Sequence, residues 1–237
     1  MSDGWNALQR DHYDHFVEGY EEEGEARKRG YARKARALAE ALRGVTGPVL
    51  EVGAGSGLVT VLLAPRLQSP RYVALDLSPE MLAFARKRVP DPRVECVVGD
   101  ATRLDAPDGA FEAVFCVDVV HHLDRPVEAL REWARVVRPG GRLVLLEANA
   151  YNPMNRAYLG VEFELRVFLN TDANLARWVT EAGWVDVRVE PAPAYTPSGP
   201  RVLGPVLDLV DRVATRLPPL RRWSALWQVE ARRGHGR

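Results

Sequence analysis

The amino-acid sequence predicts an α/β fold in which helices cover both faces of a doubly wound, mostly parallel seven-stranded sheet. Between residues 48 and 147, apolar runs of strand length alternate with amphipathic segments of helix length. Strands joined in this way run parallel, through right-handed crossovers. The first strand also runs directly into a turn with glycine at alternate positions, which then opens a helix. In such sheets ligands bind beyond the carboxyl ends of the strands, where the strand order reverses.

Length and composition favour one domain with added segments. The chain has 237 residues, enough for a substantial core, and its 32 basic residues balance its 32 acidic residues, so nothing points to a nucleic-acid partner. Both cysteines, Cys96 and Cys116, lie in apolar runs, where a reduced cysteine behaves as a small core residue. The polar, acidic N-terminus is unlike a signal peptide, and no apolar run reaches the length of a membrane span. We therefore expect a cytoplasmic protein that binds neither nucleic acid nor membrane.

Residues 1–46 are expected to form an N-terminal helical arm, and residues 47–237 the main domain. Up to residue 25 aromatic residues are scattered through an acidic background, and basic residues then follow. This charge reversal favours helix formation. From Tyr31 the apolar positions keep helical spacing until Gly44 provides a stop.

The glycine turn lies in the sequence VLEVGAGSGLVT, residues 49–60. Glycine allows backbone angles with φ > 0 and lets a ligand approach the peptide units. A dinucleotide-binding G-x-G-x-x-G turn needs its third glycine at Leu58, and a P-loop needs Gly-Lys-Ser/Thr after the turn; neither pattern is present. The third glycine is instead Gly57, and Glu51 precedes the turn within the strand. This E-x-G-x-G-x-G arrangement resembles the first motif of the class I S-adenosylmethionine-dependent methyltransferases.

The resemblance implies a Rossmann-like fold, an enzyme, and S-adenosylmethionine as the cofactor, with S-adenosylhomocysteine as the product. The turn would contact the cofactor through Glu51, Gly53, Ala54, Gly55 and Gly57. In related methyltransferases the N-terminal arm often folds over the cofactor. This implies that Tyr13 and Tyr20 close over it as a lid, with packing alone as the alternative.

The second strand, residues 71–76, ends in Asp76. This acid lies about 20 residues beyond the glycine turn, the separation at which nucleotide-binding folds place the acid that binds the ribose. Its carboxylate can accept hydrogen bonds from both ribose hydroxyls. Ser78 then caps a helix that Pro79 opens. Leu77 and Met81 are also expected to contact the cofactor, Met81 at the adenine.

Two further segments are similar to the family pattern. The third strand, residues 93–98, runs into G-D-A at residues 99–101, and the acid of this family segment binds the adenine amino group. The fourth strand begins in FEAVFCVDVVHHL, residues 111–123, which resembles the family segment beside the methionine end of the cofactor. The contacts implied by these two segments come from Gly99, Asp100, Ala101, Val117 and Asp118.

The remaining elements complete the sheet. A helix is followed by R-P-G-G at residues 138–141, which we expect to end it before a fifth strand at residues 142–147. Thr171 caps a later helix, and strands follow at residues 184–190 and 226–231. The resemblance implies that the last strand is antiparallel.

Residues 148–170 and 191–222 are expected to be insertions on the substrate side of the domain. An amphipathic stripe along residues 203–217 favours contact with the sheet or with a second copy of the chain rather than with a membrane. The protein is therefore expected as a monomer or homodimer, with a small-molecule acceptor as its substrate.

The implied reaction is in-line transfer of the methyl group from the sulfonium of the cofactor to oxygen, nitrogen or carbon of that small molecule. The sulfonium leaves readily, so the main task of the protein is to align donor and acceptor, an effect with a ceiling on the order of 10⁵ to 10⁸ M in effective molarity. A general base would add about 10² to 10⁴ where the acceptor must lose a proton. His121 and His122 are the candidates, and capping of the turn by this pair is the alternative. No metal is expected.

Three other functions remain open. A nucleic-acid or protein amino-group methyltransferase would often show Asn/Asp-Pro-Pro-aromatic after the fourth strand, whereas the chain has D-V-V-H at residues 118–121. A nicotinamide dehydrogenase would need the glycine that Leu58 replaces. A non-catalytic S-adenosylmethionine-binding module would share the same motifs, and turnover would distinguish it.

Overall fold

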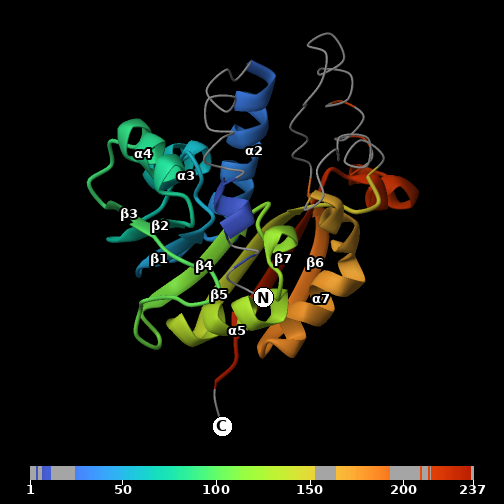
Figure 1. Cartoon of the computed structure of the whole chain (residues 1–237). Coiled ribbons are helices and arrows are strands. Elements are labelled where there is room, and N and C mark those ends of the chain that lie inside the picture. The colour runs from blue at the N-terminus through green and yellow to red at the C-terminus, as the bar shows by residue number, and fades with distance from the viewer. Residues whose placement is uncertain are drawn as a thin grey trace.

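The computed structural model describes residues 4, 7–11, 25–152, 164–192, 209, 213 and 215–235. These residues form a seven-stranded sheet in the order β3-β2-β1-β4-β5-β7-β6, with helices on both faces (Figure 1). Strands β1 to β5 pair in parallel. Strand β7 runs antiparallel to both of its neighbours, β5 and β6. The predicted Rossmann-like sheet with an antiparallel last strand is therefore confirmed.

Helices follow β1, β2 and β4, as the apolar pattern predicted, but no helix lies between β3 and β4. The strands are β1 (Val49–Val52), β2 (Tyr72–Asp76), β3 (Val94–Val98), β4 (Phe111–Val117), β5 (Val137–Ala148), β6 (Trp184–Ala192) and β7 (Leu226–Arg233). The α-helices are α2 (Glu25–Ala41), α3 (Leu58–Leu63), α4 (Pro79–Arg88), α5 (Pro126–Val136) and α7 (Asp172–Glu181). The 3₁₀ helices are η1 (Ala64–Arg66), η2 (Val120–His122), η3 (Glu164–Leu169) and η4 (Pro218–Trp223).

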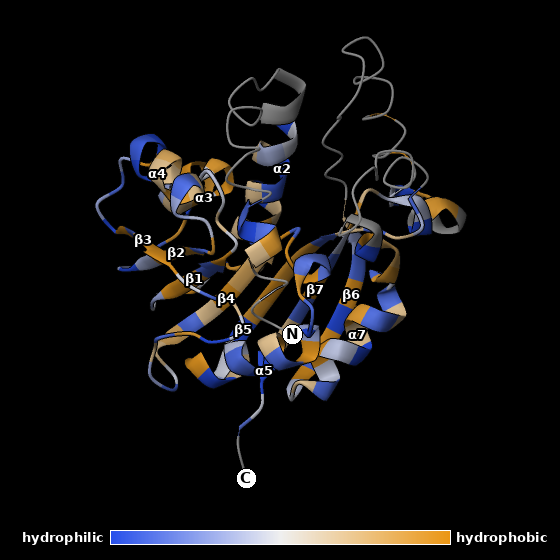
Figure 2. Ribbon diagram, viewed as in Figure 1, coloured by the Kyte–Doolittle hydropathy of each residue, from blue (hydrophilic) through white to orange (hydrophobic). Residues whose placement is uncertain are grey.

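The central strands are buried on both faces, which explains their unbroken apolar runs. On one face α5 and α7 pack against the sheet, and Trp133 and Trp184 are fully buried there. On the other face α2 and α3 contribute Leu38 and Leu63. Figure 2 shows the hydrophobic residues gathered in the strands and on the inner sides of these helices. Burial of a leucine side chain contributes about 1.5 to 3 kcal/mol, so these two layers hold the sheet rigid.

Two predicted helix starts are confirmed by their hydrogen bonds. The Ser78 hydroxyl accepts from the Met81 amide at 3.0 Å, and Pro79 occupies the first turn of α4. The Thr171 hydroxyl accepts from the Asn174 amide at 3.1 Å at the start of α7. A cap of this kind contributes about 1 kcal/mol. The first of them begins α4 with only two residues between it and the end of β2, which fixes the chain around Asp76.

The fifth strand begins earlier than the sequence predicted. Strand β5 starts at Val137, which pairs with Phe111, and the R-P-G-G segment lies inside the strand. Gly140 has a φ of +74°, and a Cβ on Gly141 would lie 2.6 Å from the Glu112 carbonyl oxygen. The glycines thus form an irregularity that pairing with β4 accommodates. The expectation that the R-P-G-G segment precedes the fifth strand was wrong, because a local turn signal does not reveal pairing with β4.

Several expectations fall outside the described residues. The described residues do not include Tyr13 and Tyr20. They also do not include residues 153–163 and 193–208 of the two segments expected on the substrate side. Val213 and Leu217 of the amphipathic stripe are described and exposed, so at these positions the stripe does not cover the sheet. The division of the chain at residue 46 stays a prediction.

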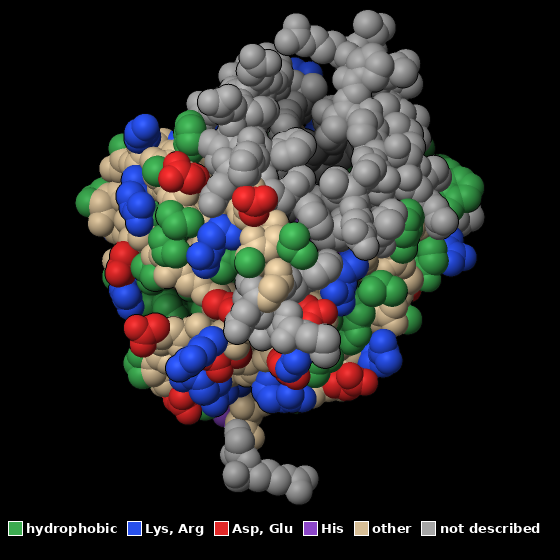
Figure 3. Space-filling model, viewed as in Figure 1, with side chains coloured by type: hydrophobic (Ala, Val, Ile, Leu, Met, Phe, Trp, Pro, Cys, Tyr) green, Lys and Arg blue, Asp and Glu red, His purple; other side chains and the backbone are tan. Residues whose placement is uncertain are grey.

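The described surface carries charges of both signs. Figure 3 shows Lys and Arg side chains interspersed with Asp and Glu on one face, in keeping with the equal numbers of basic and acidic residues. Within the part of the chain that the structure describes, no helix combines the length and the apolar character needed to cross a membrane.

Candidate active site

The strand order reverses between β1 and β4, and the predicted site residues gather at the carboxyl ends of the strands around this point. In the glycine turn, Gly53, Gly55 and Gly57 have φ angles of +72°, +53° and +79°. A Cβ on Gly53 would collide with the Val119 side chain, and a Cβ on Gly57 would lie 3.0 Å from the Ala85 Cα. At Gly55 an added Cβ would meet nothing within 4 Å. Packing therefore requires glycine at two positions, while the third borders open space.

Asp76 faces this turn from the end of β2. Its carboxylate accepts a hydrogen bond from the Gly55 amide at 2.7 Å and another from the Ser78 amide at 2.9 Å. These bonds hold the side chain beside the glycine turn. A carboxylate can accept about four hydrogen bonds, so the arrangement suits a ribose diol.

The G-D-A segment follows β3, the strand that pairs with β2 on the side away from β1. The Gly99 amide donates to the Asp76 carbonyl oxygen at 2.9 Å, and Asp100 accepts from the amide and the hydroxyl of Thr102, both at 2.7 Å. The Trp133 indole donates to the Ala101 carbonyl oxygen at 2.8 Å, which ties the segment to α5.

The neighbouring side chains differ in exposure. Leu77, Gly99, Asp100 and Ala101 are partly exposed, as a ligand site requires, whereas Met81 is buried in the packing of α4. The contact of Met81 with the adenine stays a prediction.

Glu51 lies in β1 beneath the turn and is buried. Its carboxylate accepts hydrogen bonds from the Thr60 hydroxyl at 2.6 Å and the Tyr72 hydroxyl at 2.7 Å. Burial raises the pKa of Glu51 from 4.5 to about 7, although both hydrogen bonds act in the opposite direction. These contacts join β1, β2 and α3, so the structure supports a scaffolding role for Glu51. A direct contact with the cofactor stays a prediction.

Val117 and Asp118 come at the end of β4, next to β1. Asp118 adopts the left-handed conformation with a φ of +54°, and its amide donates to the Leu146 carbonyl oxygen at 2.8 Å. Its Oδ2 lies 2.5 Å from the Nζ atom of Lys34, a residue of α2. Residues other than glycine seldom adopt this conformation, and when they do they are often part of a functional site.

Glu147 organises the chain after β4, and sequence analysis gave it no role. Its side chain is fully buried at the end of β5. One carboxylate oxygen accepts from the amides of Val119 and Val120 at 2.9 and 2.8 Å. The other lies 3.1 Å from His121 Nδ1 and accepts from the Asn170 side chain at 3.0 Å. The sequence did contain a signal for Glu147. An acidic residue at the end of an apolar strand, at the edge where ligands bind, indicates that its charge has a function.

The two histidines occupy different positions in η2. His121 is buried against Glu147, whereas His122 is partly exposed, and their rings lie 4.0 Å apart. The His122 carbonyl oxygen accepts a hydrogen bond from the Gln9 side chain at 2.5 Å. The N-terminal segment thus reaches the turn after β4. Proton transfer and capping of the turn both stay predictions for this pair.

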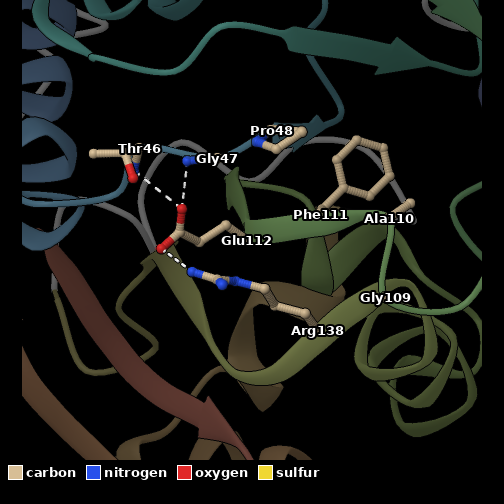
Figure 4. A pocket seen from close by; sticks show the side chains of 8 residues that line it. All are labelled: Thr46, Gly47, Pro48, Gly109, Ala110, Phe111, Glu112 and Arg138. Atoms are coloured by element: carbon tan, nitrogen blue, oxygen red, sulfur yellow. Dashed lines mark hydrogen bonds and ion pairs between the residues drawn. The ribbon is translucent and has the colours of Figure 1, made fainter.

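A pocket of about 230 Å³ lies at the opposite, amino-terminal edge of β4 (Figure 4). Its Glu112 carboxylate accepts from the backbone amides of Thr46 and Gly47 and pairs with Arg138. Burial raises the pKa of Glu112, but these partners lower it more, so the pKa lies below its usual value. The polar groups of this pocket bind one another, and it is remote from the switch point. In the described parts of the chain no group of three or more His, Cys, Asp or Glu residues could hold a metal ion.

Comparison with known proteins identifies the family. Residues 50–145 match the model of a methyltransferase domain. A demethylmenaquinone methyltransferase from Renibacterium salmoninarum is 30% identical over 201 residues, which cover 74% of this chain and 83% of that protein. The chain belongs to the class I S-adenosylmethionine-dependent methyltransferases. This methyltransferase is also 36% identical to a demethylmenaquinone methyltransferase from Mycolicibacterium gilvum over 178 residues, covering 65% of this chain and 75% of that protein.

Solved structures agree with the fold. An S-adenosylmethionine-dependent methyltransferase from Thermotoga maritima superimposes with a TM-score of 0.66 at 20% identity, covering 93% of this chain and 98% of that one. Phosphoethanolamine N-methyltransferase 2 from Haemonchus contortus, in complex with S-adenosyl-L-methionine, gives a TM-score of 0.61 at 20% identity and covers 85% of this chain and 52% of that one. Membership of the family confirms that the methyltransferase is an enzyme and that its cofactor is S-adenosylmethionine.

Proposed function

We propose that this methyltransferase transfers the methyl group to a small aromatic acceptor that carries an ionisable hydroxyl, of the quinol class. The observation that carries the proposal is the contact between His121 and the buried Glu147 carboxylate beside the switch point. The names of the two relatives described above support the same acceptor class. A quinol must lose a proton on methylation, whereas alignment alone suffices for an acceptor that is already a strong nucleophile.

The cofactor residues are proposed on the geometry of the carboxyl edge. Asp76 binds the ribose hydroxyls, and Asp100 binds the adenine amino group. The backbone of the glycine turn, Gly53 to Gly57, lies against the cofactor. Val117 and Asp118 lie at its methionine end. The bound cofactor supplies a methyl group on a sulfonium that leaves readily. The residues of this chain hold the acceptor in line with it and exclude water from the site.

His121 is the proposed proton acceptor. Because a carboxylate faces Nδ1, that nitrogen carries the ring proton and Nε2 is the basic nitrogen. Glu147 would then stabilise the imidazolium that forms when Nε2 takes the proton of the acceptor hydroxyl. The ring carbon activated by the resulting oxyanion takes the methyl group and then loses its own proton, which restores the hydroxyl. The sequence offered both histidines for this role, but His121 has the oriented carboxylate partner. His122 therefore serves as the matched control on the same turn.

The test is turnover of S-adenosylmethionine with a reduced, demethylated naphthoquinol, with S-adenosylhomocysteine and the methylated ring both measured by mass spectrometry. His121→Ala should lower turnover by about 10² to 10⁴, and the remaining activity should rise with pH as solvent deprotonates the acceptor. His122→Ala should have a much smaller effect. Unchanged turnover of His121→Ala from about pH 6 to 9 would contradict its role as a base. If S-adenosylhomocysteine forms with other metabolites but not with the quinol, the acceptor class is wrong.

A further inference from the structure

Two buried polar atoms near Glu147 have no hydrogen-bond partner in the part of the chain that the structure describes. They are Oδ1 of Asn170, which is fully buried, and the indole nitrogen of Trp227, which is 5% exposed. The buried indoles of Trp133 and Trp184, by contrast, donate to backbone carbonyl oxygens at 2.8 and 2.9 Å. An unsatisfied buried polar group is costly, so these two atoms call for an explanation.

Both side chains lie next to the Glu147 carboxylate. The Asn170 amide group donates to Glu147 Oε2 at 3.0 Å, and the same oxygen lies 3.1 Å from His121 Nδ1. Trp227 in β7 lies directly opposite Glu147 in β5. Residues opposite each other in an antiparallel pair point to the same face of the sheet, here the face that α5 and α7 cover. The proposed base and the two unpaired atoms are therefore gathered around one carboxylate at the carboxyl end of β5.

The two atoms have complementary chemistry. The indole nitrogen of Trp227 only donates, and the amide oxygen of Asn170 only accepts. A hydroxyl group does both, so one hydroxyl of a ligand can satisfy the two atoms together. The partly exposed ring of Tyr151 packs edge to face against Trp227, with 6.4 Å between the ring centroids. The cluster thus combines aromatic surface with a binding pattern for a hydroxyl group.

We propose that Asn170 and Trp227 bind a second hydroxyl of the acceptor ring, while His121 acts on the first. Trp227 Nε1 donates to the oxygen of this second hydroxyl, and Asn170 Oδ1 accepts a hydrogen bond from its O–H group. The inference rests on the proposed function and narrows the acceptor class to aromatic rings that carry two hydroxyls.

The test compares two ligands by calorimetry in the presence of S-adenosylhomocysteine and without oxygen: 1,4-naphthalenediol, and 1-naphthol, which lacks the second hydroxyl. The unmodified chain should bind the diol more tightly, because 1-naphthol leaves buried polar groups unpaired. Trp227→Phe keeps an aromatic ring but removes the N–H group. It should weaken diol binding by about 5- to 150-fold, because the buried hydroxyl loses its donor, and should leave 1-naphthol binding unchanged.

Two control variants separate binding from packing. Trp223→Phe changes an exposed indole just before β7 and should change neither affinity. Trp184→Phe removes a buried indole of the same size and leaves the Leu130 carbonyl oxygen without its donor, whereas among the described residues no group depends on the Trp227 N–H. Trp184→Phe should therefore lower Tm more than Trp227→Phe does, yet keep the preference for the diol.

The outcomes separate the inference from the proposed function. If Trp227→Phe keeps the diol preference, or binds both ligands equally more weakly, the inference is wrong. Equal affinity of the unmodified chain for the two ligands would also overturn the inference but leave the proposed function standing. Binding of neither ligand by the unmodified chain would contradict the proposed function and the inference with it.

A second replacement covers the case in which Trp227→Phe does not fold. Site-specific replacement of Trp227 by 3-benzothienylalanine keeps the size of the ring system and puts sulfur in place of the N–H group. This protein should show the same selective loss of diol binding. A diol preference equal to that of the unmodified chain would refute the inference.

Discussion

Replacement of Glu51 by glutamine should abolish a large pH dependence of folding stability. Glu51 is buried, and its pKa is raised from 4.5 to about 7. Glutamine has nearly the same shape and can still form hydrogen bonds with the Thr60 and Tyr72 hydroxyls, but it carries no ionisable proton. The variant therefore removes the titration while keeping most of the packing.

The sign follows from the raised pKa. Below about pH 4.5 the carboxyl is protonated in both the folded and the unfolded chain, and it has no effect on the pH dependence. As the pH rises towards 7 the unfolded chain ionises first, so the free energy of unfolding falls until the folded chain ionises as well. One pKa unit corresponds to about 1.4 kcal/mol, so the difference between 4.5 and about 7 corresponds to about 3 kcal/mol. For a chain of this length that is about 6 to 12 °C in Tm.

The assay is denaturant unfolding of the ligand-free chain at several pH values. The stability of Glu51→Gln relative to the unmodified chain should rise by about 3 kcal/mol between about pH 4.5 and 8.5. Glu112→Gln is the control with the opposite sign, because hydrogen bonds lower the pKa of Glu112. The Glu112→Gln variant should be less stable than the unmodified chain at neutral pH, and this difference should vanish as the pH is lowered. A pH-independent difference for Glu51→Gln would refute the reasoning.

Three further predictions concern the site. Asp76→Ala should weaken S-adenosylhomocysteine binding by about 3 kcal/mol or more in calorimetry, because two hydrogen bonds to a charged acceptor are lost; unchanged affinity would place the ribose elsewhere. Glu147→Gln should lower the free energy of unfolding by about 1 to 3 kcal/mol, because an amide N–H₂ group would face the N–H donors of His121 and Asn170. A melting curve like that of the unmodified chain would argue against the hydrogen-bond network around Glu147. Gly57→Ala should cost about 2 to 4 kcal/mol through strain and the contact with α4, whereas Gly55→Ala, which meets open space, should cost about 1 to 2 kcal/mol. Equal losses in urea unfolding would show that α4 does not constrain the turn.

Much of the fold was predictable because its signals are local. Strand β1 is recognisable from an apolar run that is buried on both faces, and Ser78 and Thr171 mark the starts of α4 and α7 through hydrogen bonds that span three residues. Asp76 could be placed from its separation from the glycine turn alone. Such features depend on neighbouring residues and on the fixed geometry of parallel strands.

The rest of the site was decided by contacts between distant parts of the chain. Lys34 and Asp118 are 84 residues apart, and only the packing of α2 beside the end of β4 brings them together. Glu147 contacts His121 from 26 residues away and Asn170 from 23, so its place at the centre of a buried network depends on how β4, β5 and the segment before α7 are assembled. The amino-acid sequence by itself determined the strands, the glycine turn and the family. Tertiary structure decided which buried charges meet, because burial and partner distance depend on the assembled fold and not on local sequence.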